Sequence, residues 1–151
     1  EFELSSGWQL SNALIGIGRG DLFGIGLGNS IQKNLYLPEP HTDFIFAIIL
    51  EETGIIGGFL LMLLFILLIT SIVQISFDAL RQNRLFQGYV CFGIGSLLSI
   101  QSIFNIGVNI GLLPTKGLTL PFISYGGASL IIFMLMMGIV FRVDFENRNL
   151  D

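Results

Sequence analysis

Long apolar runs without a charged side chain recur three times along this chain. Residues 55–75 carry no charge, and every residue from 59 to 69 is apolar. Residues 85–113 are also uncharged, and a shorter run over 124–141 ends at Arg142. A helix needs about 20 mostly apolar residues to cross a hydrocarbon layer ~30 Å thick, because each residue rises about 1.5 Å. The pattern therefore predicts three membrane-spanning helices.

The first of these spans is expected to begin well before its uncharged part. Two prolines break the preceding segment, so Thr42 or Asp43 is a candidate N-cap for a helix over residues 43–77. An unbroken helix of this length would extend for ~50 Å, which exceeds the hydrocarbon thickness. We therefore expect its first two turns to protrude from the membrane or to line a wet cavity. Glu51 and Glu52 follow these turns, and we expect them to face a cavity or another helix rather than lipid.

The arginines predict which side of the membrane each connection occupies. Residues 78–84 and 142–151 each contain two arginines, which places both segments in the cytoplasm by the positive-inside rule. The intervening spans then put residues 1–42 and residues 114–123 together on the outer face. Three cations on that outer side weaken the charge bias: Arg19, Lys33 and Lys116.

Composition excludes a soluble protein. Apolar residues make up 52% of the chain and charged residues 12%, against roughly 25% charged in soluble domains. The cations are scattered, which argues against nucleic-acid binding. The single cysteine, Cys91, excludes a disulfide framework and a cysteine metal site. The fold class expected is an all-α polytopic membrane bundle, and the absence of a signal-peptide pattern predicts a piece of a longer polypeptide.

Two polar or glycine-rich patterns are assigned structural roles. Glycine recurs every second or fourth residue over 16–28, but the strand, helix and lysine context of a nucleotide-binding loop is missing, so we expect a re-entrant or interfacial loop. Gln101, Asn105 and Asn109 recur every four residues and form one stripe on the second span. Hydrogen bonding between helices is favoured over a substrate path.

Glu39, His41 and Asp43 are the candidate chemical groups of the outer segment. They could converge at the membrane surface to transfer protons, and a metal role stays open. Asp43 could instead serve only as a helix cap.

Two strings resemble the outer loops of the FtsW/RodA (SEDS) family. They are residues 29–47, which end in LPEPHTDFIFA, and residues 113–127, which read LPTKGLTLPFISYGG. The likeness keeps the family's order from Gly7 to the third span. The Lys116 region is similar to the division branch, whereas the elongation branch usually lacks that lysine. Residues 49–54 and Pro40 depart slightly from the family pattern, at no ionisable position.

The resemblance implies a protein of ten spans, of which this chain holds the fourth outer loop and the last three. The family polymerises lipid II into β-1,4 glycan strands at the outer face of the bacterial cytoplasmic membrane. The division branch works at the septum beside a class B penicillin-binding transpeptidase and other divisome membrane proteins. The chain alone is expected to be inactive.

By the same resemblance, Asp43 matches the family's catalytic aspartate. It would take the proton of the attacking 4-hydroxyl as undecaprenyl pyrophosphate leaves with one inversion. Lys116 is the first candidate to stabilise the pyrophosphate, and a divalent cation such as Mg²⁺ or Mn²⁺ is the alternative. The other expected substrate-binding residues are Arg19, Lys33, Glu39, His41 and Thr42.

Two rival functions remain open at this stage. A flippase for lipid-linked precursors would use the polar stripe and Glu51/Glu52 at membrane depth. A non-catalytic division scaffold would need neither. An enzyme needs its indispensable carboxylate at the outer surface, which favours the enzyme if Asp43 lies there.

Overall fold

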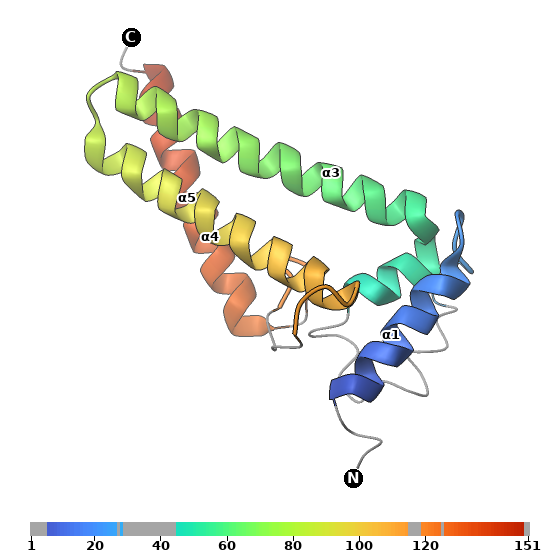
Figure 1. Cartoon of the computed structure of the whole chain (residues 1–151). Coiled ribbons are helices and arrows are strands. Elements are labelled where there is room, and N and C mark those ends of the chain that lie inside the picture. Colours follow the sequence, from blue (N-terminus) through green and yellow to red (C-terminus); the bar gives the residue numbers. More distant parts are fainter. Residues whose placement is uncertain (1–5, 27, 29–44, 115–118, 125, 150–151) are drawn as a thin grey trace.

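The computed structural model describes residues 6–26, 28, 45–114, 119–124 and 126–149. Within these residues the regular structure is entirely helical, as the sequence predicts. The helices are α1 (Ser6–Gly20), α3 (Ile45–Arg81), α4 (Leu85–Asn109) and α5 (Gly127–Asn149). In Figure 1, α3 and α4 form an antiparallel pair that α5 crosses, and α1 lies beside the start of α3.

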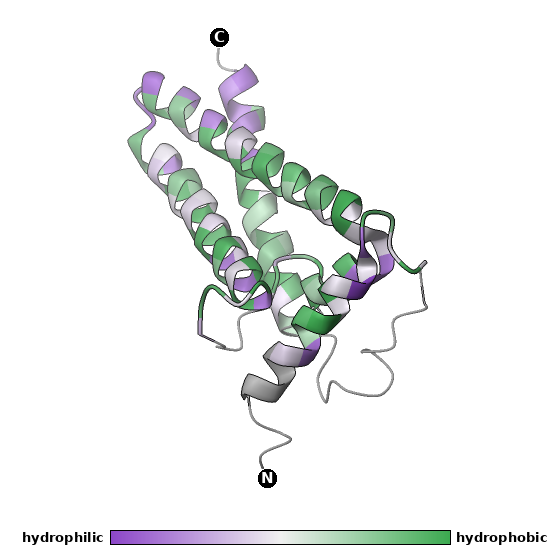
Figure 2. Ribbon diagram, turned by 45° about the vertical axis from the view of Figure 1, so that its right-hand side comes forward, coloured by the Kyte–Doolittle hydropathy of each residue, from purple (hydrophilic) through white to green (hydrophobic). Residues whose placement is uncertain are grey.

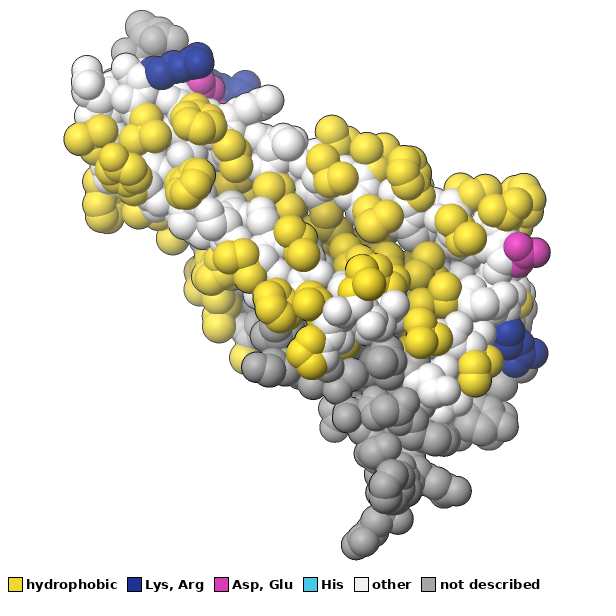
Figure 3. All heavy atoms as spheres, in the orientation of Figure 1, with side chains coloured by type: hydrophobic (Ala, Val, Ile, Leu, Met, Phe, Trp, Pro, Cys, Tyr) yellow, Lys and Arg dark blue, Asp and Glu magenta, His cyan; other side chains and the backbone are white. Residues whose placement is uncertain are grey.

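The three longest helices, α3, α4 and α5, are each long and apolar enough to cross a membrane, which confirms the predicted class. Figure 2 shows apolar residues along the middle of these helices and hydrophilic ones toward their ends. Many large apolar side chains on their outer faces are exposed, as the face in Figure 3 also shows. Such surfaces are stable against lipid or against further apolar helices.

The interior of the α3–α4–α5 bundle is a single apolar cluster. Its members are side chains that recur on one face of each helix, and partly buried neighbours complete it. The buried members are Ile72, Ala79, Cys91, Ile94, Leu98, Phe133, Val140 and Val143. Gly95 lets Ile72 approach closely, because a Cβ at Gly95 would lie 3.2 Å from the Ile72 Cγ2.

The turn between α3 and α4 is shorter than the predicted loop over 78–84, because α3 continues to Arg81. Asn83 adopts a left-handed conformation (φ 59°). Its N–H donates to the Leu80 carbonyl (3.1 Å) and the Arg84 N–H to the Ala79 carbonyl (2.9 Å). These two bonds form a Schellman motif, which satisfies carbonyls at a helix end.

The same motif ends α4 at Asn109, four residues before the predicted end of the span. Gly111 is left-handed (φ 78°), and its N–H donates to the Val108 carbonyl (3.1 Å). The Leu112 N–H donates to the Gly107 carbonyl (2.8 Å). Gly111 therefore stops the helix.

Helix α5 is shifted relative to the predicted span over 124–141. It begins at Gly127 and runs through Arg142 to Asn149, so most of the predicted tail is helical. Two ion pairs support this extension, each between residues one helical turn apart. They join Arg142 Nε to Glu146 (2.7 Å) and Arg148 Nε to Asp144 (3.0 Å).

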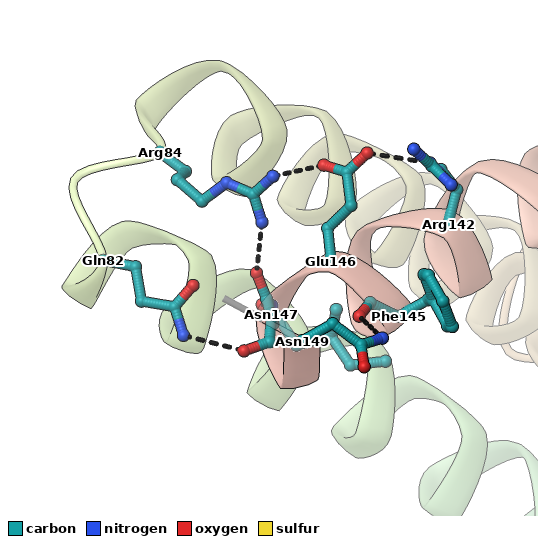
Figure 4. Close-up of polar contacts among 8 residues, drawn as sticks. Gln82, Arg84, Arg142, Phe145, Glu146, Asn147 and Asn149 are labelled. Carbon is teal, nitrogen blue, oxygen red and sulfur yellow. Dashed lines mark hydrogen bonds and ion pairs between the residues drawn. The ribbon is translucent and has the colours of Figure 1, made fainter. Parts of the chain in front are cut away.

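A polar cluster fastens the end of α5 to the α3–α4 turn (Figure 4). Arg84 bonds Glu146 and also donates to the Asn147 Oδ1 (3.3 Å). Asn147 Nδ2 in turn donates to the Ile75 carbonyl of α3 (3.1 Å), and Gln82 Nε2 donates to the Asn147 carbonyl (3.0 Å). The cluster therefore ties three helices together at the end opposite α1.

The predicted unbroken first span is wrong, because α3 is interrupted at Gly54. Its dihedral angles (φ 72°, ψ −174°) are not helical, and this combination is essentially restricted to glycine. The break divides α3 into residues 45–53 and residues 55–81, and Figure 1 shows the two parts at an angle.

Residues 21–26, here called the strap, satisfy the backbone groups that the break exposes. The Ile25 and Gly26 N–H groups donate to the Glu51 and Glu52 carbonyls (3.0 and 3.1 Å). In return, the N–H groups of residues 55 and 56 donate to the carbonyls of residues 21 and 22 (3.0 and 3.4 Å). The interruption is tolerated because other protein groups replace the lost helical bonds.

Helix α1 lies in the segment that the sequence analysis treated as a loop. Glycines at positions 16, 18 and 20 lower helix propensity and hid the apolar spacing of Ala13 and Ile17. Ala13 packs with Ala47 of α3 and Val108 of α4. The last residue of α1, Gly20, lies so close to α3 that an added Cβ would collide with the Leu50 carbonyl.

The close approach of the strap to the break predicts the effect of Gly54→Ala. A Cβ at Gly54 would collide with the Leu22 carbonyl and lie 2.5 Å from the Gly24 N. Together with the forbidden dihedral angles, this should cost on the order of 2–4 kcal/mol. Thermal unfolding of the full-length protein in detergent would measure the loss.

Gly93→Ala is the matched control, because Gly93 lies within α4 with nothing within 4 Å of an added Cβ. It should leave the unfolding temperature unchanged or slightly raised. Equal stability of the two variants would show that the strap does not pack against the break.

Candidate functional site

Most of the predicted site residues lie outside the described residues: Asp43, Glu39, His41, Thr42, Lys33 and Lys116. Arg19 is described, and it lies exposed in the last turn of α1. Among the described residues there is no group of three or more His, Cys, Asp or Glu side chains that could hold a metal ion. The Glu39, His41 and Asp43 set is not among those described, so its metal role stays a prediction.

A cavity of about 630 Å³ lies between the start of α3 and the start of α5. It is lined by Ile45, Phe122, Ile123, Ser124, Gly126, Gly127 and Leu130. Ile45 is two residues beyond Asp43 in the sequence, and Phe122 is six residues beyond Lys116. The fold therefore brings the ends of both predicted outer segments to the same cavity.

A compact turn over residues 120–124 forms one wall of this cavity. The Leu120 N–H donates to the Ser124 Oγ (2.8 Å), and the Ser124 N–H donates back to the Leu120 carbonyl (3.1 Å). Phe122 has a left-handed backbone (φ 65°), and its ring lies 5.4 Å from that of Phe133 on α5. A bulky residue in this conformation is held by its surroundings. Sequence reasoning gave no signal for Phe122.

The polar stripe on α4 holds both walls of the cavity in place. Gln101 Nε2 donates to the Thr119 carbonyl (3.1 Å), which anchors the end of the Lys116 segment. Asn109 Oδ1 accepts the Ala47 N–H (3.0 Å), which anchors the first turn of α3. Asn109 Nδ2 also donates to the Asn105 carbonyl (2.9 Å). The predicted hydrogen bonding between helices is confirmed for Asn109, whereas Gln101 bonds Thr119, which lies outside the helices.

Glu51 lies where α3 packs against α1, since its Cα would be 3.0 Å from a Cβ added at Gly20. Its residue is fully buried (0% exposed) and does not protrude. The neighbouring Glu52 is partly buried, and its backbone carbonyl receives a strap bond. Buried carboxylates of this kind face other helices rather than lipid, as the alternative expectation held.

The model of the FtsW/RodA/SpoVE family, described as a cell cycle protein, matches residues 2–149. A probable peptidoglycan glycosyltransferase FtsW of Coxiella burnetii is 54% identical over 147 residues, which is 97% of this chain and 40% of that protein. The FtsW of Marinomonas mediterranea, with the same description, is 56% identical over 144 residues, 95% of this chain and 36% of the relative. The chain thus spans about two-fifths of the length of these relatives.

A solved structure, "Structural coordination of polymerization and crosslinking by a peptidoglycan synthase complex", is also similar. It aligns with a TM-score of 0.69 at 29% identity and covers 93% of this chain and 38% of the solved one. The match across nearly the entire chain, with the same helical arrangement, leads to one assignment: the chain belongs to the FtsW/RodA/SpoVE family of cell cycle proteins.

Proposed function

We propose that the full-length protein is a peptidoglycan glycosyltransferase that polymerises lipid II into β-1,4 glycan strands at the division septum. The observation that carries this proposal is the cavity. It is lined by Ile45, two residues beyond Asp43, and by Phe122, six residues beyond Lys116. The FtsW relatives are themselves named as probable peptidoglycan glycosyltransferases, which supports the same activity.

Asp43 acts as the general base in this proposal. The acceptor's 4-hydroxyl is a poor nucleophile at neutral pH, so a carboxylate within hydrogen-bond reach must take its proton as the new bond forms. The oxygen attacks the anomeric carbon of the growing strand, and the bond to undecaprenyl pyrophosphate breaks. A single displacement inverts the α-linked carbon to the β configuration.

Lys116 stabilises the charge that develops on the leaving pyrophosphate. Arg19 and Lys33 are the next candidates, and Glu39, His41 and Thr42 are placed as substrate-binding neighbours of Asp43. Lys116 precedes the anchored residue Thr119 by three positions, so the Gln101 bond limits how far its segment can move. A tethered cation loses less freedom when it binds its anion.

The hydrogen bonds of the α4 stripe favour an enzyme over a flippase. Gln101 and Asn109 use their side-chain amides to hold Thr119 and Ala47, which lie close in sequence to the cavity residues Phe122 and Ile45. Groups that line a transport path must instead exchange partners with the passing headgroup. The stripe therefore suits a fixed site at the end of the bundle better than a path through it.

The same proposal includes the expected partners and location. The similar solved structure concerns a complex of polymerisation and crosslinking, which supports a penicillin-binding transpeptidase partner for this protein. We place the cavity at the outer face of the bacterial cytoplasmic membrane, because the arginine-bearing turn and the end of α5 lie at the opposite end of the bundle (Figure 1).

Asp43→Asn in the full-length protein tests the proposed chemistry. Asparagine caps helices about as well as aspartate but cannot take up the hydroxyl proton. We expect normal insertion and folding with a loss of glycan synthesis from purified lipid II on the order of 10²-fold or more. Glycan synthesis near the wild-type rate by a folded Asp43→Asn variant would remove Asp43 as the base and direct the search to Glu39.

The orientation of the bundle is tested by single cysteines at Thr119 and Asn83 in a Cys91→Ala background. An impermeant thiol reagent applied to intact spheroplasts should label the cysteine at 119 and spare the one at 83, because only the former is expected outside. Cys91 is fully buried, so its replacement removes little background but makes the assay unambiguous. The opposite labelling pattern would invert the topology.

A further inference from the structure

We infer that Asn109 is a positioning residue for catalysis, because it caps the first turn of α3 from another helix. This inference rests on the proposed function and deepens it. The contact joins residues 62 positions apart: the Ala47 N–H of α3 donates to the Asn109 Oδ1 at the end of α4, at 3.0 Å.

The Ala47 amide takes an oxygen from another helix. Ala47 lies in the first described turn of α3. Side-chain oxygens that accept from a helix amide act as caps, and they usually come from a residue close in sequence. Here Asn109 supplies the oxygen from α4.

The orientation of the Asn109 amide is fixed by its other bonds. Its Nδ2 donates to the Asn105 carbonyl (2.9 Å) and approaches the Asn105 Oδ1 (3.3 Å). An amide N–H of the backbone can only donate, so the Asn109 atom that faces Ala47 must be the oxygen. Asn105 and Asn109 are 1% and 0% exposed, so water does not compete for these bonds.

This arrangement has a direct consequence for the proposed base. Because Asn109 accepts the Ala47 N–H, a carboxylate at position 43 is not needed to satisfy that amide. Ala47 is four residues beyond Asp43 in the sequence and two residues beyond Ile45 of the cavity wall. The bond to α4 therefore holds in place the turn of α3 that follows the proposed base.

The test compares Asn109→Leu with Asn147→Leu in the full-length protein. Asn147 is a matched control: it is also a nearly buried asparagine (6% exposed) that bonds backbone and side chain on other helices, but it lies at the opposite end of the bundle. Asn109→Leu should lower kcat for lipid II polymerisation on the order of 10- to 100-fold, because small misplacements of a reacting group are costly. KM should change by less than about twofold, since the substrate-binding groups remain.

Asn147→Leu should lower the unfolding temperature by a similar amount and leave kcat close to wild type. Adding Asn109→Leu to the Asp43→Asn variant should leave its residual rate unchanged, because Asn109 is inferred to act only by positioning the base at residue 43. Equal kcat losses in Asn109→Leu and Asn147→Leu, or additive losses with Asp43→Asn, would overturn the inference.

A second measurement keeps the inference independent of activity. Hydrogen exchange of the peptide that contains Ala47 should be faster in Asn109→Leu than in wild type and unchanged in Asn147→Leu. Unchanged exchange in Asn109→Leu would show that the cap does not form. If the variants show this exchange pattern but the wild-type protein makes no glycan from lipid II, the proposed function is refuted and the Asn109 contact still stands.

Discussion

The arrangement of the whole site depends on the backbone pairing between the strap, residues 21–26, and the break in α3 at Gly54. Four hydrogen bonds replace those that the helix loses: two carbonyls of α3 are taken by strap amides, and two amides of α3 by strap carbonyls. Without this exchange, each backbone group left unpaired away from water would cost several kcal/mol. The break is therefore stable only as long as the strap lies against it, and the glycines at 20, 24 and 54 allow that approach.

The break gives the first part of α3 a direction that a straight helix would not have. Residues 45–53 turn toward the end of α4, where Asn109 receives the Ala47 amide and where α1 packs against both helices. The far end of the bundle is held separately by Arg84, Glu146 and Asn147. The cavity beside Ile45 thus lies at one end of a bundle whose other end is also held by polar contacts, and the α4 stripe bonds the segments that lead to both of its walls.

The sequence predicted the long helices well because uncharged apolar runs admit few other structures in a membrane. It predicted their ends poorly. Asn83 and Gly111 stop helices because they adopt left-handed conformations, but the sequence does not distinguish them from the asparagines and glycines that lie within the spans. The break at Gly54 was hidden among the nearby Gly57 and Gly58, since only the distant strap decides which glycine leaves the helix. The interpretation of the polar stripe succeeded because buried amides in a membrane must find partners. Asp43 and Lys116 came from resemblance, which no local pattern could replace.

In the proposed mechanism, substrate reacts at the cavity between the starts of α3 and α5. Photocrosslinking tests this directly: a benzophenone side chain is placed at Ile45, at Leu130 or at Ile103 in the full-length protein and irradiated with labelled lipid II. Ile45 and Leu130 line the cavity, whereas Ile103 lies in an apolar groove between α3 and α4. Reaction at the cavity predicts crosslinks to lipid II from positions 45 and 130. Crosslinks from position 103 alone would contradict reaction at the cavity and favour a substrate path along the bundle.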